Sequence, residues 1–166
     1  RRRLLLGGAM DRDRPAIEAI LDAHGVQPLS AARPIRRWSD ACPGLPMCGH
    51  AITESHRLLP DLLDRIERVL DELDRSNVPS CVRVAACPAG CTRSFMAEIA
   101  IIGRTISTVT YEGKYAIYVG GDRHGRRLAT LYHDLVPSSR IVGTLTPLLG
   151  LYRRDRLPSE TFGGFC

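Results

Sequence analysis

The clearest hydrophobic pattern in the sequence is an apolar stripe between Pro60 and Leu73 that repeats every 3.6 residues. Its members are Leu62, Leu63, Ile66, Val69, Leu70 and Leu73. The positions between them carry acidic and basic side chains, Glu67 among them, which we expect to face solvent. This segment is therefore predicted to be an amphipathic helix that packs against a core.

Four other segments are predicted to be helical. They are a helix capped by Asp11 or Asp13 that carries Ile17, Ile20 and Leu21 and ends at Gly25, a helix over residues 49–59, one over residues 127–135, and one that starts near Ser138 and contains Pro147. Residues 26–41 contain two prolines and no helical period, so we expect an extended segment there.

Short runs rich in Val, Ile, Thr and Tyr are typical of strands. Such runs occupy residues 81–86, 98–103, 105–111 and 115–119, with a turn at Glu112-Gly113, and Leu4 to Leu6 read as a short buried strand. The order of strands and helices predicts an α+β fold, a mixed β-sheet with packed helices. At 166 residues, we expect residues 1–166 to form one domain.

Composition limits the classes of function. The chain is 44% hydrophobic and contains no run of 18 apolar residues, so we expect no membrane span. Its net charge of +5 comes with few aromatic residues and scattered arginines, which favours an anionic cofactor or an acidic partner over nucleic acid. Six cysteines without a recognisable secretory signal indicate a reducing, cytoplasmic location and a metal.

Two cysteine pairs carry the candidate chemistry. Cys42 and Cys48 form a C-x5-C pair, and Cys87 and Cys91 form a C-x3-C pair, each with Pro and Gly between the thiols. Four thiolates from two such loops can hold an iron–sulfur cluster. A structural zinc site, a disulfide framework and unrelated buried thiols are the alternatives. Cys81 belongs to neither pair, and we interpret it as a structural thiol.

Arginines flank both cysteine pairs. Arg36 and Arg37 precede the first pair, Arg83 and Arg93 bracket the second, and Arg123 lies in a glycine–arginine turn at residues 120–127. They are either solvated charges or groups that neutralise a polyanionic cofactor. The turn is either a plain connection or, with the helix predicted after it, an anion site. His50 and His56 are interpreted as polar loop residues, and Cys166 as a non-ligand.

These motifs resemble those of a known family. Residues 41–48 with 51–54 are similar to the first cluster loop of the sirohaem- and [4Fe–4S]-dependent nitrite and sulfite reductases. Residues 82–93 with 96–98 are similar to their second loop, and residues 120–127 to a later turn. The resemblance spans roughly residues 36–165 and is strongest to the C-terminal part of a sulfite reductase haemoprotein. It implies the fold of the nitrite/sulfite reductase 4Fe–4S domain.

The resemblance also implies an activity, the six-electron reduction of sulfite to sulfide at coupled [4Fe–4S] and sirohaem centres. Cys42, Cys48, Cys87 and Cys91 would be the cluster ligands, and Cys91 would also bridge to the sirohaem iron. The macrocycle would contact Arg36, Arg37, Arg83, Arg93 and Arg123. Ala89 departs from the family, in which Asn is common at this position of the second loop.

The same resemblance implies partners and leaves alternatives. The chain would need the N-terminal half of the same enzyme, which supplies the substrate-binding cations, and would be inactive alone. Ferredoxin or an NADPH-dependent flavoprotein would donate electrons. Gly49 favours nitrite as the substrate, whereas residues 45–47 and 162–165 favour sulfite. Relatives that act on corrin precursors and a non-enzymatic iron–sulfur electron-transfer module are further alternatives.

Overall fold

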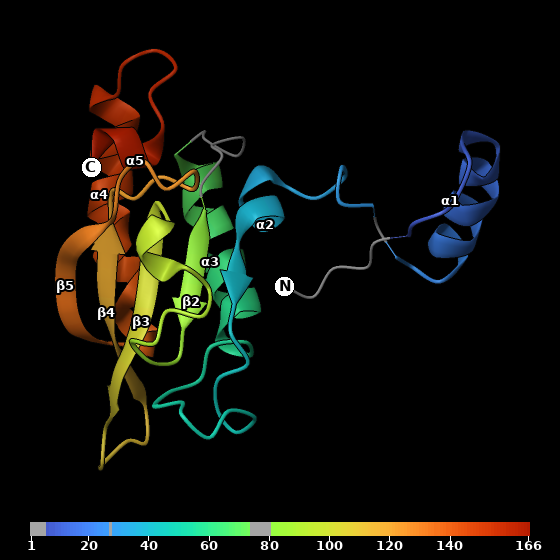
Figure 1. Ribbon diagram of the computed structural model, residues 1–166. Helices are drawn as coiled ribbons and strands as arrows, with labels where there is room; N and C mark the ends of the chain where they lie inside the picture. Colours follow the sequence, from blue (N-terminus) through green and yellow to red (C-terminus); the bar gives the residue numbers. More distant parts are fainter. Residues whose placement is uncertain (1–5, 27, 74–80) are drawn as a thin grey trace.

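The computed structural model describes residues 6–26, 28–73 and 81–166, and a five-stranded mixed sheet lies at its centre (Figure 1). The strands, in their spatial order, are β1 (Asp40–Ala41), β2 (Val82–Ala85), β3 (Ile99–Ile106), β4 (Gly113–Val119) and β5 (Thr130–Pro137). β1, β2 and β3 run parallel, whereas β4 and β5 are antiparallel to their neighbours. The predicted mixed sheet is confirmed.

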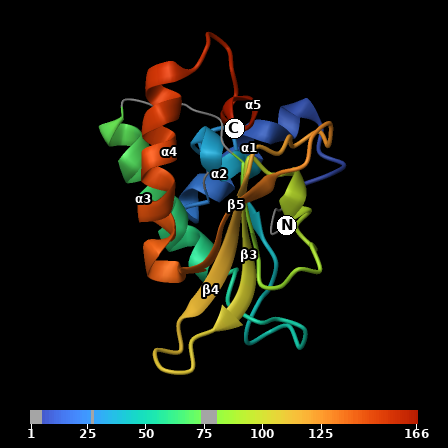
Figure 2. The same cartoon turned by 90° about the vertical axis from the view of Figure 1, so that its left-hand side faces the viewer.

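Five α-helices accompany the sheet in the described part of the chain. They are α1 (Arg14–Ala23), α2 (Pro34–Trp38), α3 (Leu58–Glu72), α4 (Ile141–Asp155) and α5 (Phe162–Phe165). α3 and α4 lie side by side on one face of the sheet (Figure 2). The opposite face carries the connection between β2 and β3, which includes a 3-10 turn at Ser94–Met96. The sheet is therefore a middle layer, with helices on one side and the β2–β3 connection on the other.

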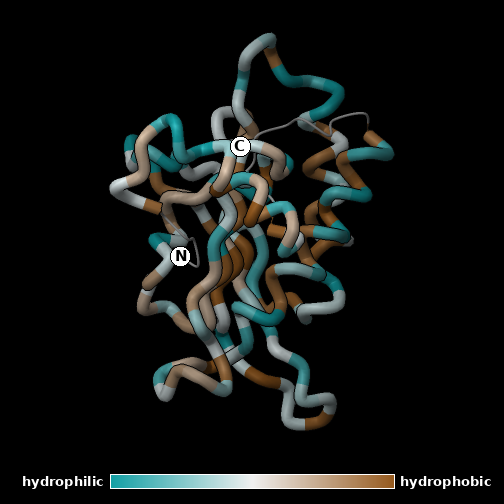
Figure 3. The backbone as a smooth tube through the Cα atoms, turned by 90° about the vertical axis from the view of Figure 1, so that its right-hand side faces the viewer, coloured by the Kyte–Doolittle hydropathy of each residue, from teal (hydrophilic) through white to brown (hydrophobic). Residues whose placement is uncertain are grey.

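The main core lies between the sheet and the α3–α4 pair. Leu62, Leu63, Ile66 and Leu70 are buried, which confirms the predicted stripe on α3. Val82 and Val84 of β2 join the same core, whereas Cys81 belongs to a smaller cluster with Ala97 and Ala100. Every residue of β2 is buried because both faces of this strand are covered. The hydrophobic strands accordingly lie at the centre of Figure 3.

The N-terminal helix takes no part in this core. α1 begins one residue after Asp13, and Gly25 with its positive φ of 68° follows its end. No residue of α1 is buried, Ile20 is 60% exposed, and Figure 1 places the helix apart from the sheet. The strand predicted for Leu4 to Leu6 lies outside the described residues, apart from Leu6, which is exposed and not in a strand.

Two predictions in this region, an extended segment over residues 26–41 and a helix over residues 49–59, were wrong in part. Residues 26–41 are not wholly extended, since α2 begins at Pro34, whose fixed φ suits the first position of a helix. Residues 49–57 are turns and not helix. The N–H groups of Ile52 and Thr53 both donate to the carbonyl of Ala86 at 3.1 Å, so they are not available for a helical ladder.

Two predictions in the C-terminal half were also wrong. Residues 105–111 are no separate strand, because β3 continues to Ile106 and a hairpin loop follows. Residues 130–137 form strand β5 instead of the predicted helix. Leu128, Leu131 and Leu135 have helical spacing but are each more than half exposed. These leucines therefore have the spacing of an apolar helix face but do not pack in the core. The final helix with Pro147 inside it is confirmed.

The described ranges contain no helix long and apolar enough to cross a membrane.

Candidate cofactor-binding site

The two cysteine loops leave the sheet at the same edge. Cys42 directly follows β1, and Cys87 comes two residues after the end of β2. These strands are parallel neighbours, with Ala41 opposite Val84. The carboxyl ends of parallel strands are the usual location of ligand sites in open sheets. The topology therefore brings the two loops together although 38 residues separate Cys48 from Cys87.

Backbone hydrogen bonds connect the two loops. The N–H of Cys42 donates to the carbonyl of Val84 at 3.2 Å, and the segment after the first loop docks on Ala86 through Ile52 and Thr53. Gly103 of β3 lies beneath this junction. A Cβ at Gly103 would fall under 3.0 Å from Thr53 Oγ1 and from the Ala86 carbonyl. The junction therefore requires glycine at this position.

The thiol of Cys42 lies within a network of hydrogen bonds. Its Sγ accepts the Ala86 N–H at 3.2 Å and lies 3.1 Å from Ser55 Oγ, while Ser55 donates to the Cys42 carbonyl at 2.6 Å. A Cβ on Gly44, which has a φ of 65°, would come within 2.7 Å of Ser55 N and Oγ. N–H···S hydrogen bonds of this kind tune the potential of thiolate-ligated iron. The surroundings of Cys42 thus suit a cluster ligand.

All four paired thiols are at least partly open to solvent, and Cys42 is half-buried. Cys48 and Cys87 are half-buried and Cys91 is exposed. Each loop contains a turn. The Cys48 N–H donates to the carbonyl of Gly44 at 2.9 Å, and the Arg93 N–H donates to the carbonyl of Gly90 at 2.7 Å. Across residues 6–26, 28–73 and 81–166, no three His, Cys, Asp or Glu side chains are grouped to hold a metal ion. The role of the four thiols as cluster ligands stays a prediction that the loop geometry favours.

The arginines before the first loop contact protein groups. Arg36 donates to Glu67 at 2.7 and 2.9 Å and pairs with Asp64. Arg37 donates to the carbonyls of Ala32 and Ser30. Glu67, which we expected to face solvent, is only 8% exposed, because α2 covers it and supplies its counter-charge. These two arginines hold α2 in place, and their contact with a macrocycle stays a prediction.

The arginines around the second loop differ in exposure. Arg83 is buried and its Nη1 donates to the carbonyl of Arg93 at 2.9 Å. Arg93 is exposed, and its φ of 53° is in the left-handed region. The buried residue thus holds the backbone of the exposed one. A role for either in cofactor binding stays a prediction.

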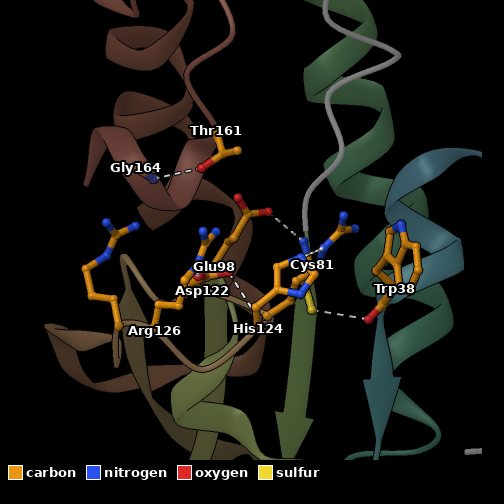
Figure 4. A pocket seen from close by; sticks show the side chains of 11 residues that line it. Trp38, Cys81, Glu98, Asp122, His124, Arg126, Thr161 and Gly164 are labelled. Carbon is orange, nitrogen blue, oxygen red and sulfur yellow. Dashed lines mark hydrogen bonds and ion pairs between the residues drawn. The ribbon is translucent and has the colours of Figure 1, made fainter.

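Arg123 lies at the opposite end of the sheet from the cysteine loops, in the wall of a cavity of about 560 Å³ (Figure 4). Its guanidinium stacks on Trp38, 4.4 Å from the ring centroid. Cys81, the residue before β2, lines the same cavity and is 2% exposed. Burial raises the pKa of the Cys81 thiol, which agrees with a structural role. A strand and not a helix follows the 120–127 turn, so the predicted helix N-terminus does not exist here.

Comparison with known proteins shows which family the sequence resembles over nearly its whole length. The chain is 40% identical over 163 residues to the "Sulfite reductase (NADPH) hemoprotein beta-component" of Nitrobacter winogradskyi and 40% identical over 162 residues to that of Nitrosomonas europaea. Both alignments cover 98% of this chain. The chain belongs to the sulfite reductase haemoprotein family. It spans about 27% of the length of these relatives.

The fold agrees with this assignment to the sulfite reductase haemoprotein family. The structure of the Mycobacterium tuberculosis NirA protein matches 93% of this chain and 29% of its own, with a TM-score of 0.71 and 24% identity. At that identity the match shows the fold, and it confirms the predicted architecture. No family model matches the sequence.

The sequence analysis missed several residues that shape this member of the haemoprotein family. Ser55 and Thr53 bind the cysteine loops, yet isolated hydroxyl residues in a segment predicted as helix gave no signal. Glu98 is a buried carboxylate that accepts the N–H groups of Cys81 and Gly163, each at 3.0 Å. Burial raises the pKa of Glu98. Its partners are 17 and 65 residues away, so only the folded chain reveals them.

Proposed function

We propose that this chain is the part of a sulfite reductase that carries the [4Fe–4S] cluster and one side of the sirohaem site. The observation that carries the proposal is the junction of the two cysteine loops at the carboxyl ends of β1 and β2. The identity of 40% to sulfite reductase haemoproteins supports it. The chain would work in the cytoplasm as an oxidoreductase.

The residues present fit such a cluster. Cys42, Cys48, Cys87 and Cys91 supply four thiols on two loops, and the Ala86 N–H is already directed at one sulfur. Glycines with positive φ at Gly44 and Gly90 shape the loops. When bound, a cluster coupled to sirohaem would pass on, one at a time, the six electrons from an external donor that convert sulfite sulfur from +4 to −2.

The chain's own residues would hold and tune these groups. Cys91, the most open of the four paired thiols, would present its sulfur to both the cluster and the sirohaem iron, since a thiolate keeps lone pairs after binding one iron. Arg93, two residues further and exposed, would offset the negative charge added there. Ala89 offers no side-chain amide near these groups.

Other parts of the enzyme would complete the reaction. We propose that a further part of the same enzyme, outside the 27% of the relatives' length that this chain spans, provides the cations that bind sulfite. The relatives are named as β-components of an NADPH-dependent sulfite reductase, which favours an NADPH-dependent flavoprotein over ferredoxin as the electron donor. The chain on its own would then not reduce sulfite, even with a strong chemical reductant.

Anaerobic reconstitution tests the cluster. We expect the protein treated with iron and sulfide to bind four irons and four labile sulfides per chain, the composition of one [4Fe–4S] cluster. Serine at Cys42, Cys48, Cys87 or Cys91 should lower iron and labile sulfide strongly. Cys81→Ser and Cys166→Ser are the matched controls and should retain both. Full loading in Cys48→Ser, or full loss in Cys81→Ser, would contradict the ligand assignment.

A second experiment separates the proposed reaction from its alternatives. The protein assembled with its N-terminal half and sirohaem is assayed with sulfite and with nitrite. Faster turnover of sulfite supports the proposal, and faster turnover of nitrite favours a nitrite reductase. A cluster without any bound sirohaem would instead indicate an electron-transfer module. Cys91→Ser should change the sirohaem absorption, and an unchanged haem spectrum would remove Cys91 from the bridging role.

A further inference from the structure

Arg83 is a buried cation in the middle of the sheet. It is 5% exposed, and it points to the face opposite Val82 and Val84, which pack in the α3–α4 core. On that face the β2–β3 connection covers it. The side chain therefore lies beneath the segment that carries Cys87 and Cys91, on the strand that leads into this segment.

The charge of Arg83 has no carboxylate counter-charge within ion-pair distance in the described part of the chain. Its hydrogen-bond partner is the carbonyl of Arg93, and the neutral thiol of Cys81 lies nearby. A guanidinium stays charged in proteins and has five N–H donors. Asp40, a carboxylate with interactions of its own, occupies the position opposite Arg83 on β1. A buried charge without a directly paired carboxylate is costly, and an anionic group bound nearby would offset that cost.

The carbonyl that Arg83 holds belongs to the turn directly after Cys91. Arg93 has a φ of 53°, which non-glycine residues seldom adopt. Its carbonyl accepts from Arg83 and also from the N–H of Met96 at 3.0 Å. The N–H of Arg93 donates back to Gly90. Two donors on one carbonyl thus maintain an unusual backbone conformation beside the exposed thiol.

We propose that Arg83 is a positioning residue for the second cysteine loop, which it braces through the Arg93 carbonyl and whose anionic cofactor it balances with its buried positive charge. The second part rests on the proposed function, whereas the brace exists without a cofactor. A cluster gains negative charge on reduction, so a nearby fixed cation favours the reduced form. Removal of the cation therefore lowers the reduction potential.

Hydrogen exchange of the cofactor-free protein tests the brace. In Arg83→Met we expect the amides of residues 93–97 to exchange at least tenfold faster than in the unmodified protein. Arg83→Lys keeps an N–H donor and should restore part of the protection. Arg93→Gln removes an exposed side chain but keeps the carbonyl, and should exchange as the unmodified protein does. Unchanged exchange in both Arg83 variants would overturn the brace.

A redox titration of the reconstituted cluster, followed by electron paramagnetic resonance, tests the charge. Arg83→Met should shift the midpoint potential to more negative values, and Arg83→Lys should stay close to the unmodified protein. Arg153→Met, an exposed arginine on α4, is the control and should cause no shift. An unchanged potential in Arg83→Met overturns the charge role. Failure of the unmodified protein to bind a cluster would instead contradict the proposed function, and the exchange experiment would remain decisive for the brace.

Discussion

The two ends of the sheet are built in different ways. At the carboxyl ends of β1 and β2, backbone hydrogen bonds and glycines hold the cysteine loops together, and all four paired thiols remain at least partly accessible. At the other end, side chains make the connections: Glu98 accepts the N–H groups of Cys81, just before β2, and of Gly163 in α5, and Asp122 pairs with Arg126. A loop that is held by its main chain leaves its side chains available to bind a ligand. Where side chains make the contacts that hold the structure, those side chains are already bonded within the protein.

The length of β2 separates the two ends of the sheet, and this separation decides which arginines lie near the cysteine loops. From Cys81 to Ala86 the chain advances five residues, about 17 Å of extended strand. Arg123 is therefore far from the thiols along β2, and Arg83 lies between the two ends. We infer that contacts at the Glu98 end act on the cysteine loops chiefly through the sheet and not by direct charge interaction.

The largest effect is expected at the cysteine end, from Gly103→Ala. The new Cβ would collide with Thr53 Oγ1 and the Ala86 carbonyl, and a backbone atom cannot easily move. We expect a loss of about 3 kcal/mol of unfolding free energy, at the upper end for overpacking. Urea unfolding measures it, and iron loading after reconstitution should fall as well.

Gly143→Ala is the matched control, because a Cβ at this position of α4 meets no atom within 4 Å. Alanine favours a helix over glycine by up to about 1 kcal/mol, so this variant should be as stable as the unmodified protein or more so. Equal stability of Gly103→Ala and the unmodified protein would show that the two loops are not packed against β3 as described.

An intermediate effect is expected from Glu98→Ala at the opposite end. The change leaves the N–H groups of Cys81 and Gly163 without their acceptor, at a cost of about 2 kcal/mol. Urea unfolding measures the loss. If the two ends are built separately, iron loading at the cysteine loops should change little. A loss of loading equal to that of Gly103→Ala would contradict the separation.

The pH dependence of the Glu98 end follows from the same carboxyl. Burial raises its pKa above the ordinary 4.5, so the neutral acid is favoured in the folded protein, and Arg123, Arg127, Cys81 and Cys166 surround it. The stabilisation is complete below pH 4.5 and is lost as the pH rises through the folded-state pKa. Glu98→Gln does not titrate. The unmodified protein should therefore lose stability relative to Glu98→Gln as the pH rises above 4.5, and parallel pH profiles would contradict this.

The smallest effect is expected from Asp122→Asn, since this pair is exposed on the Arg126 side. Hydrogen bonds from Arg126 and the His124 N–H lower the pKa of Asp122 to about 2. The stabilisation is present above the ordinary value of 3.8 and is lost as the pH falls towards 2. As the pH falls from 3.8 towards 2, the Tm of the unmodified protein should decrease more than the Tm of Asp122→Asn. This difference in Tm should be smaller than the change caused by Glu98→Ala. An equal acid sensitivity of both proteins would argue against the pair.

The sequence by itself determined the features that depend on local pattern. The stripe on α3, the strand at residues 82–85 and the two cysteine loops follow from periodicity, β-branched residues and Pro–Gly turns. The resemblance in the loops indicated the family, which the relatives confirm. These features are carried by residues close together in the chain, where spacing alone contains the information.

Only the tertiary structure decided the rest. Residues 49–57 do not form the predicted helix because the carbonyl of Ala86 accepts the N–H groups of Ile52 and Thr53. Residues 130–137 pair with β4 although their leucines have helical spacing. Several charged residues have hydrogen-bond partners that are 10 to 65 residues away in the sequence, namely Arg36, Glu67, Glu98 and Arg83. A charge far along the chain leaves no periodic signal, so no local pattern can show whether an arginine faces solvent, braces a loop or balances a buried acid.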